Sequence, residues 1–165
     1  MEKVRFGIIG YGNMGSGHAA HFREGKIKNG VLTAICDINP AKIETAKKVF
    51  GDDVKYFDTP EALFASGACD AVMVCTPHYL HPTLAIAAGD AGLHCIVEKP
   101  AGVYTLQVKE MLDHAKKSGK ILGIMFNQRT NPAFRKMREM VLNGSIGKVK
   151  RTNWIITDWY RTQEY

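Results

Sequence analysis

Short apolar runs alternate with helical segments along the chain up to residue 126. The runs cover residues 4–9, 31–36, 55–57, 71–75, 94–97 and 121–125; the helical segments cover 14–26, 41–50, a short stretch opened by Thr59-Pro60, 80–91 and 105–117. Near-continuous apolar strands separated by helices are typical of a parallel sheet that is covered on both faces. The sequence therefore predicts an α/β fold, a Rossmann-like doubly wound parallel sheet, over residues 1–126. We expect Thr105 to cap the last of these helices.

The alternation stops after residue 126. Asn131-Pro132 predicts a longer helix to about residue 143, and residues 149–157 predict a strand. One helix and one strand cannot close a sheet, so residues 127–165 are interpreted as the truncated start of an α+β domain. We expect Met137 and Met140 in its core, and exposed apolar surface from Trp154 to Tyr165, Trp159 included, unless a partner covers it.

Composition narrows the class of protein. Apolar residues make up 45% and charged residues 23%, and no apolar run approaches the roughly 18 residues that span a bilayer. A soluble, cytoplasmic protein without a membrane partner is the expectation. The net charge is +6, but the basic clusters are spread along predicted helices and are interpreted as solvated faces, so no nucleic acid is expected. The four cysteines form no C-x-x-C pair, so neither zinc nor a disulfide framework is expected.

The stretch Gly10-Tyr11-Gly12-Asn13-Met14-Gly15 follows the first strand and opens a helix. This is the context that a dinucleotide-binding G-x-G-x-x-G loop requires. Gly10 permits a tight turn, Gly12 lets a pyrophosphate approach the backbone, and Gly15 allows the helix to pack closely on the strand. We therefore predict cofactor binding at Gly10, Gly12, Asn13, Met14 and Gly15, and interpret Tyr11 as an exposed loop position.

An acidic residue at the end of the second strand completes this pattern. Asp37 follows Gly15 by about the 20 residues that the fingerprint requires, and its carboxylate can accept hydrogen bonds from ribose hydroxyls. The same charge repels a 2′-phosphate, and the next residue is Ile38, not an arginine. The sequence predicts NAD as the cofactor in preference to NADP.

Polar residues also follow the next two long strands. Thr76-Pro77-His78 comes after residues 71–75, and Glu98-Lys99-Pro100 comes after residues 94–97. Ligands of open parallel sheets bind at the carboxyl ends of the strands, so both segments are expected at the rim of one site. A strand-end charge pair followed by a turn proline remains an equally good reading of Glu98-Lys99-Pro100 on spacing alone.

Four segments in this order, GIIGYGNMG, CD, CTPHYLH and EKP, resemble the N-terminal half of the glucose-fructose oxidoreductase / inositol dehydrogenase (Gfo/Idh/MocA) family. The resemblance covers about residues 4–130 well. It implies that Lys99 is catalytic, binding the hydroxyl that is oxidised and moving its proton, and that Glu98 orients Lys99 or the nicotinamide ribose. It also implies cofactor contacts at Thr76, Pro77, His81, Glu98, Lys99 and Arg129.

The implied function is an NAD-dependent oxidoreductase acting on a hydroxyl of a sugar, polyol or inositol-type substrate. Two alternatives stay open: an NAD-dependent glycosidase of the same family, and a non-catalytic dinucleotide-sensing module. His78 and His81 are spaced H-x-x-H, but no further ligands are evident and no metal is expected.

The chain departs from the family pattern in length. Family members are longer, and their second domain supplies the sugar pocket and a further Asp and His; here all six histidines precede residue 127. We therefore expect this chain to carry the cofactor half of a parent dehydrogenase and to be inactive by itself. The resemblance implies a homo-oligomer for the full-length parent.

Overall fold

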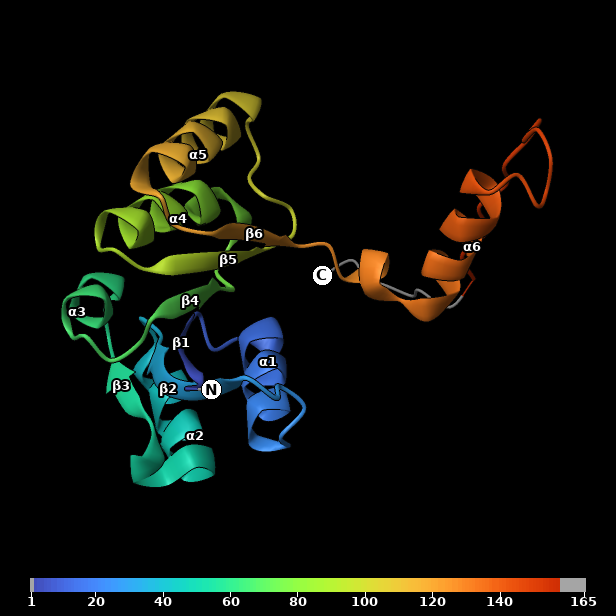
Figure 1. Ribbon diagram of the computed structural model, residues 1–165. Coiled ribbons are helices and arrows are strands. Elements are labelled where there is room, and N and C mark those ends of the chain that lie inside the picture. Colours follow the sequence, from blue (N-terminus) through green and yellow to red (C-terminus); the bar gives the residue numbers. More distant parts are fainter. Residues whose placement is uncertain (1, 158–165) are drawn as a thin grey trace. The chain divides into compact units, whose positions relative to one another are not determined.

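The computed structural model describes residues 2–157 of the chain. Six parallel strands form one sheet in the order β3-β2-β1-β4-β5-β6 (Figure 1). The order reverses between β1 and β4, so this is a doubly wound Rossmann sheet, as the alternation predicts. The strands are β1 Val4–Ile9, β2 Gly30–Cys36, β3 Lys55–Phe57, β4 Ala71–Val74, β5 His94–Glu98 and β6 Leu122–Met125.

Most helices begin where local sequence chemistry predicts. The side chains of Asn39, Thr59 and Asn131 cap α2, α3 and α6, and a proline follows each in the first turn. The expectation for Thr105 is wrong: it is the first residue of α5, and Tyr104 precedes it without a side-chain cap. The helices are α1 Asn13–Arg23, α2 Pro40–Phe50, η1 Gly51–Asp53, α3 Pro60–Ala65, η2 His78–Leu80, α4 His81–Asp90, α5 Thr105–Ser118, η3 Asn127–Thr130 and α6 Pro132–Leu142.

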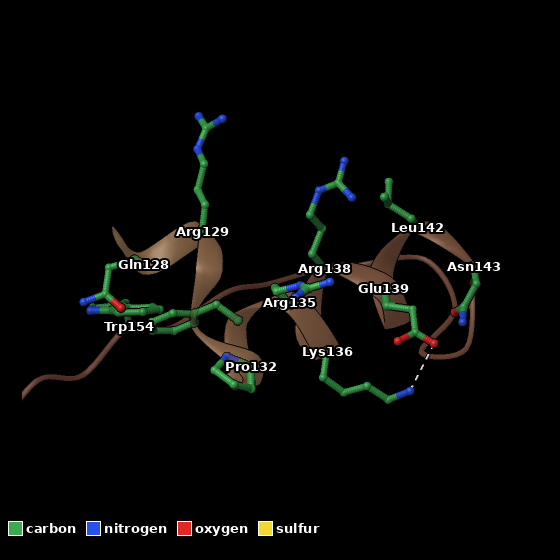
Figure 2. A pocket seen from close by; sticks show the side chains of 11 residues that line it. Gln128, Arg129, Pro132, Arg135, Lys136, Arg138, Glu139, Leu142, Asn143 and Trp154 are labelled. Atoms are coloured by element: carbon green, nitrogen blue, oxygen red, sulfur yellow. Dashed lines mark hydrogen bonds and ion pairs between the residues drawn. The ribbon is translucent and has the colours of Figure 1, made fainter. Parts of the chain in front are cut away.

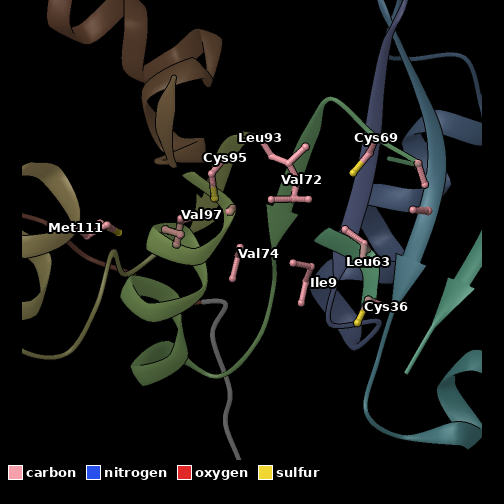
Figure 3. Close-up of a cluster of buried hydrophobic side chains, with 14 residues drawn as sticks. Ile9, Cys36, Leu63, Cys69, Val72, Val74, Leu93, Cys95, Val97 and Met111 are labelled. Atoms are coloured by element: carbon pink, nitrogen blue, oxygen red, sulfur yellow. The ribbon is translucent and has the colours of Figure 1, made fainter. Parts of the chain in front are cut away.

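Both faces of the sheet are buried, because alternate residues of each strand point to opposite sides. Ile9, Val72 and Val74 pack with residues of α3, α4 and α5 on one face (Figure 3). Ile8 and Ile35 pack with residues of α1 and α2 on the other face. Because every strand pair is parallel, the carboxyl ends of the strands meet along one edge of the sheet.

The chain divides into two compact units after Met125. In the second, residues 149–157 form no strand, so that prediction is wrong. Met137 is 54% exposed and Met140 is half-buried, so neither lies in a core among the described residues. Trp154 and Ile155 are exposed as expected, whereas Trp159 lies outside the described residues.

Within residues 2–157, none of the helices combines the length and the apolar character that crossing a bilayer requires.

Candidate functional site

The glycine loop joins β1 to α1 at the carboxyl edge of the sheet. Gly10 has a φ of 92°, and a Cβ there would lie 2.9 Å from the carbonyl carbon of Cys75. A Cβ on Gly15 would collide with the carbonyl oxygen of Gly10. A Cβ on Gly12 would meet no atom within 4 Å. Gly10 and Gly15 are therefore required by packing, whereas Gly12 borders open space.

The N-terminus of α1 faces that open space with free backbone donors. Gly12 is the capping residue, and no side chain accepts a hydrogen bond there. The first turn contains no acidic residue, and Asn13 and Met14 are exposed. A helix end with free N–H groups and a partial positive charge suits a phosphate.

Asp37, at the carboxyl end of β2, lies beside the glycine loop. Its Oδ2 accepts a hydrogen bond from the backbone N–H of Tyr11 at 2.6 Å, and its Oδ1 accepts one from the N–H of Asn39 at 2.8 Å. Each carboxylate oxygen keeps a free lone pair for a ribose hydroxyl. Tyr11 is not the exposed position that the sequence predicts: it is 5% exposed and packs with Ile8 and Ile35, and burial raises the pKa of its phenol.

Thr76 follows β4 on the opposite side of the glycine loop. Its Oγ1 is buried and has no hydrogen-bond partner among residues 2–157. A buried hydroxyl without a partner costs free energy, so it indicates a place for a polar ligand group. Pro77, the next residue, is exposed. The open space at Gly12, the Asp37 carboxylate and this hydroxyl together fit a dinucleotide.

Glu98 ends β5, and it is buried with 6% exposure. Its Oε1 lies 2.7 Å from Nε2 of His18 on α1, and its Oε2 accepts a hydrogen bond from the backbone N–H of Lys99 at 3.1 Å. Lys99 is exposed, and no partner of its amine is found in the described part of the chain. The peptide bond between Lys99 and Pro100 is cis.

His81 begins α4 and is fully buried. Its Nδ1 lies 2.8 Å from the carbonyl oxygen of Pro100, and its Nε2 lies 2.8 Å from that of Thr76. Because both nitrogens are engaged by the backbone, the expected contact with the cofactor stays a prediction. The structure shows instead that His81 links the loop after β4 to the loop after β5.

Arg129 lies on η3 of the second unit. Its guanidinium carbon is 5.0 Å from the centre of the Phe126 ring. It borders an open hollow in that unit (Figure 2), and its expected contact with the cofactor stays a prediction. The hollow is lined by Gln128, Arg129, Pro132, Phe134, Arg135, Lys136, Arg138, Glu139, Leu142, Asn143 and Trp154.

The cysteines do not offer a thiolate to the site. Cys75 lies at the end of β4, and burial first, then the charge of Glu98, raises the pKa of its thiol to about 12. Burial raises the pKa of the Cys95 thiol to about 12 as well. All four cysteines are free. In the described residues, no group of three or more His, Cys, Asp or Glu side chains is arranged to hold a metal.

Sequence reasoning missed His18, which the structure brings to Glu98. The available signal was its spacing: His18 follows Gly15 by three residues, so the two share the face of α1 that packs on the sheet. The structure brings together, in the first unit, every predicted site residue except Arg129: the glycine loop, Asp37, Thr76, Pro77, His81, Glu98 and Lys99.

Comparison with known proteins agrees with this geometry. A myo-inositol 2-dehydrogenase from Thermotoga maritima is 35% identical over 145 residues, which are 88% of this chain and 42% of that protein. A glycosyl hydrolase family 109 protein from Shewanella amazonensis is 34% identical over 127 residues, which are 70% of this chain and 27% of that protein. The chain thus spans less than half the length of these relatives.

Solved structures also match most of this chain over less than half of their own length. The WlbA dehydrogenase from Bordetella pertussis, solved with NADH and UDP-GlcNAcA, superposes with a TM-score of 0.82 at 28% identity, over 88% of this chain and 44% of that one. The family model described as "Oxidoreductase family, NAD-binding Rossmann fold" matches residues 4–126. The chain therefore belongs to the Gfo/Idh/MocA oxidoreductase family and carries its NAD-binding domain.

Proposed function

We propose that the full-length protein is an NAD-dependent dehydrogenase that oxidises a hydroxyl of a sugar, polyol or inositol-type substrate. One observation supports this most directly: the exposed amine of Lys99 follows a glutamate that is joined to the helix of the glycine loop. The 2.7 Å contact between Glu98 and His18 joins the end of β5 to α1. The proposed acid–base group and the proposed phosphate-binding helix thus lie at the same edge of the sheet.

Three groups at the carboxyl edge of the sheet would hold the cofactor. The backbone at Gly12 and the start of α1 would bind the pyrophosphate, Asp37 the adenosine ribose, and Thr76 Oγ1 a polar group nearer the nicotinamide. Bound NAD supplies a nicotinamide ring that accepts a hydride. We propose NAD in preference to NADP because the Asp37 carboxylate repels a 2′-phosphate and the exposed Ile38 beside it cannot bind one.

Lys99 would bind the substrate hydroxyl and accept its proton as hydride leaves the carbon. A general base must reach the proton it takes. The Lys99 amine is exposed at this rim, and no partner of it is found within residues 2–157. Glu98 would keep the backbone of Lys99 in place. Pro77, Asn13, Met14 and Arg129 are proposed as further cofactor contacts on the family resemblance.

Substrate and assembly are proposals about the full-length protein, because the chain spans 42% of the Thermotoga relative. The similar protein from Thermotoga maritima is named for myo-inositol, and the Bordetella pertussis structure contains a UDP-sugar. These names favour a polyhydroxylated small molecule. We propose a homo-oligomer formed through the remainder of the second domain.

The cofactor assignment is tested on the 165-residue chain by calorimetric titration with NADH and with NADPH. We expect tighter binding of NADH, and about a tenfold or greater loss of that preference in Asp37→Ala. Asp52→Ala, on the surface at η1, is the control and should bind NADH as the unaltered chain does. Equal binding of both cofactors by the unaltered chain would contradict the NAD preference.

The catalytic assignment is tested in the full-length protein with Lys99→Met. We expect turnover of inositols and sugars to fall by about two to four orders of magnitude while NADH affinity stays within about twofold. Lys109→Met, exposed on α5, is the matched control. Unchanged turnover in Lys99→Met would exclude Lys99 as the base.

A second candidate, an NAD-dependent glycosidase, is favoured by the similarity to the Shewanella amazonensis glycosyl hydrolase. Product analysis separates the two. A dehydrogenase forms NADH in proportion to oxidised product, whereas a glycosidase of this kind releases a sugar without net NADH. Binding of NADH with neither product would favour the dinucleotide-sensing module.

A further inference from the structure

We propose that His18 and His81 are positioning residues. Each contacts one of the two residues that flank Lys99 in the sequence, and together they hold the Lys99 backbone in place. His18, on α1, contacts Glu98, the residue before Lys99; His81, on α4, contacts Pro100, the residue after it. The effect on catalysis rests on the proposed role of Lys99, whereas the restraint of the Lys99 backbone does not.

The first contact ties Lys99 to the helix of the glycine loop. The side chains of His18 and Glu98 are 16% and 7% exposed, so the pair is largely shielded from water. Since a carboxylate only accepts, Nε2 of His18 must carry the proton that forms the 2.7 Å hydrogen bond. The other oxygen of Glu98 accepts the N–H of Lys99 itself. Glu98 thus transmits the position of α1 directly to the Lys99 backbone.

The second contact ties Lys99 to the loop after β4. The His81 ring has no solvent exposure, and both of its nitrogens lie 2.8 Å from carbonyl oxygens, those of Pro100 and Thr76. Carbonyl oxygens only accept, so the ring donates its N–H to one of them and lies in direct contact with the other. One buried side chain therefore joins the proposed cofactor contact Thr76 to the residue after Lys99.

The consequence is a lysine with a restrained backbone and an exposed amine. Catalytic groups act well when neighbouring groups hold them near the productive geometry before the substrate arrives. Suitable control sites lie on the same two helices but away from these rings. His21 and His78 do not serve, because their rings lie edge-on to those of His18 and His81, with ring centroids 6.4 Å and 5.6 Å apart. Arg23 on α1 and Thr83 on α4 are exposed.

The test is backbone ¹⁵N relaxation of the 165-residue chain, read at the amides of Lys99 and Ala101. In the unaltered chain we expect order parameters of about 0.85, the value of rigid backbone. His18→Ala and His81→Ala should lower them toward about 0.6, whereas Arg23→Ala and Thr83→Ala should not. His18→Gln, which keeps a donor, should recover part of the loss.

The cavity left by His81→Ala could unfold the chain, so His81→Gln is the second variant. It keeps an amide that can donate to one of the two carbonyls, and we expect intermediate order parameters. Unchanged order parameters at both amides in folded His18→Ala and in a folded His81 variant would overturn the inference. Lowered values, together with full turnover in Lys99→Met, would instead keep the restraint and refute the catalytic role of Lys99.

In the full-length protein the same variants should separate positioning from folding. We expect His18→Ala to lower kcat by about tenfold with the KM for NAD changed by no more than about twofold, and His18→Gln to recover most of the loss. An equal change in Arg23→Ala would show a general effect on α1 and contradict the inference.

Discussion

The two units of the chain differ in how far they bury their apolar side chains. In the first, Met111 on α5 is 1% exposed and belongs to a cluster that crosses four strands. In the second, Met137 on α6 is 54% exposed, and no residue from 126 to 157 is buried. Each strand–helix segment of a parallel sheet supplies cover for the next, so residues 2–125 complete a core by themselves. A single amphipathic helix has no such second layer.

The largest expected effect is on the free energy of unfolding, and it separates Met111 from Met137. Met111→Ala should destabilise the chain by about 2–5 kcal/mol, because it leaves a cavity in a packed core. Met137→Ala should change the free energy of unfolding by about 0.5 kcal/mol or less. Urea denaturation followed by circular dichroism measures both. Equal losses would mean that α6 is packed as tightly as α5.

Within the first unit, Gly15 and Gly12 differ in the space that a Cβ would have. Gly15→Ala should destabilise by about 1–3 kcal/mol, because its Cβ meets the carbonyl oxygen of Gly10. Gly12→Ala should cost about 1 kcal/mol or less, because its Cβ meets no atom within 4 Å, yet it should weaken NADH binding at least about tenfold. Thermal denaturation and calorimetry read the two effects. A stable Gly12→Ala variant with full affinity would place the pyrophosphate elsewhere.

Intrinsic probes can follow each unit separately. All four cysteines lie in the first unit and both tryptophans in the second. Burial raises the pKa of the Cys36 and Cys75 thiols to about 12, so a thiol reagent at pH 8 should react only after the first unit unfolds. In a urea series we expect Trp fluorescence to change at lower urea than thiol reactivity. Coincident transitions would show one cooperative unit.

The smallest expected effect concerns two ion pairs. Arg5 lowers the pKa of Asp70, 65 residues away in sequence, whereas Lys136 and Glu139 are neighbours on one helix. Since the folded pKa of Asp70 lies below the unfolded value of about 3.9, its contribution is present above that pH and is lost as the pH falls through the folded pKa.

Asp70→Asn should therefore lower the Tm slightly at pH 7, and the difference from the unaltered chain should shrink toward pH 3. Glu139→Gln, the local pair's counterpart, should lower the Tm less at pH 7. Scanning calorimetry at both pH values checks the sign. A difference that grows on acidification would contradict the assigned direction.

Local patterns in the sequence were sufficient to predict the sheet, the glycine loop and the strand-end position of Lys99. These features depend on apolar periodicity, on helix capping and on glycine spacing, each of which acts over a few residues. The strand predicted over residues 149–157 does not form, because a strand also needs contacts beyond its own sequence. An apolar run becomes a strand only when a neighbouring strand satisfies its backbone, and the described residues of the second unit contain none.

Tertiary structure alone decided what surrounds Lys99. The bond between His18 and Glu98 joins residues 80 positions apart, and His81 reaches Thr76 and Pro100 on two different loops. Tyr11 is buried because the folded sheet places Ile8 and Ile35 around it. Such contacts depend on which strand ends become neighbours, and that is set by the order of the sheet and not by any local spacing.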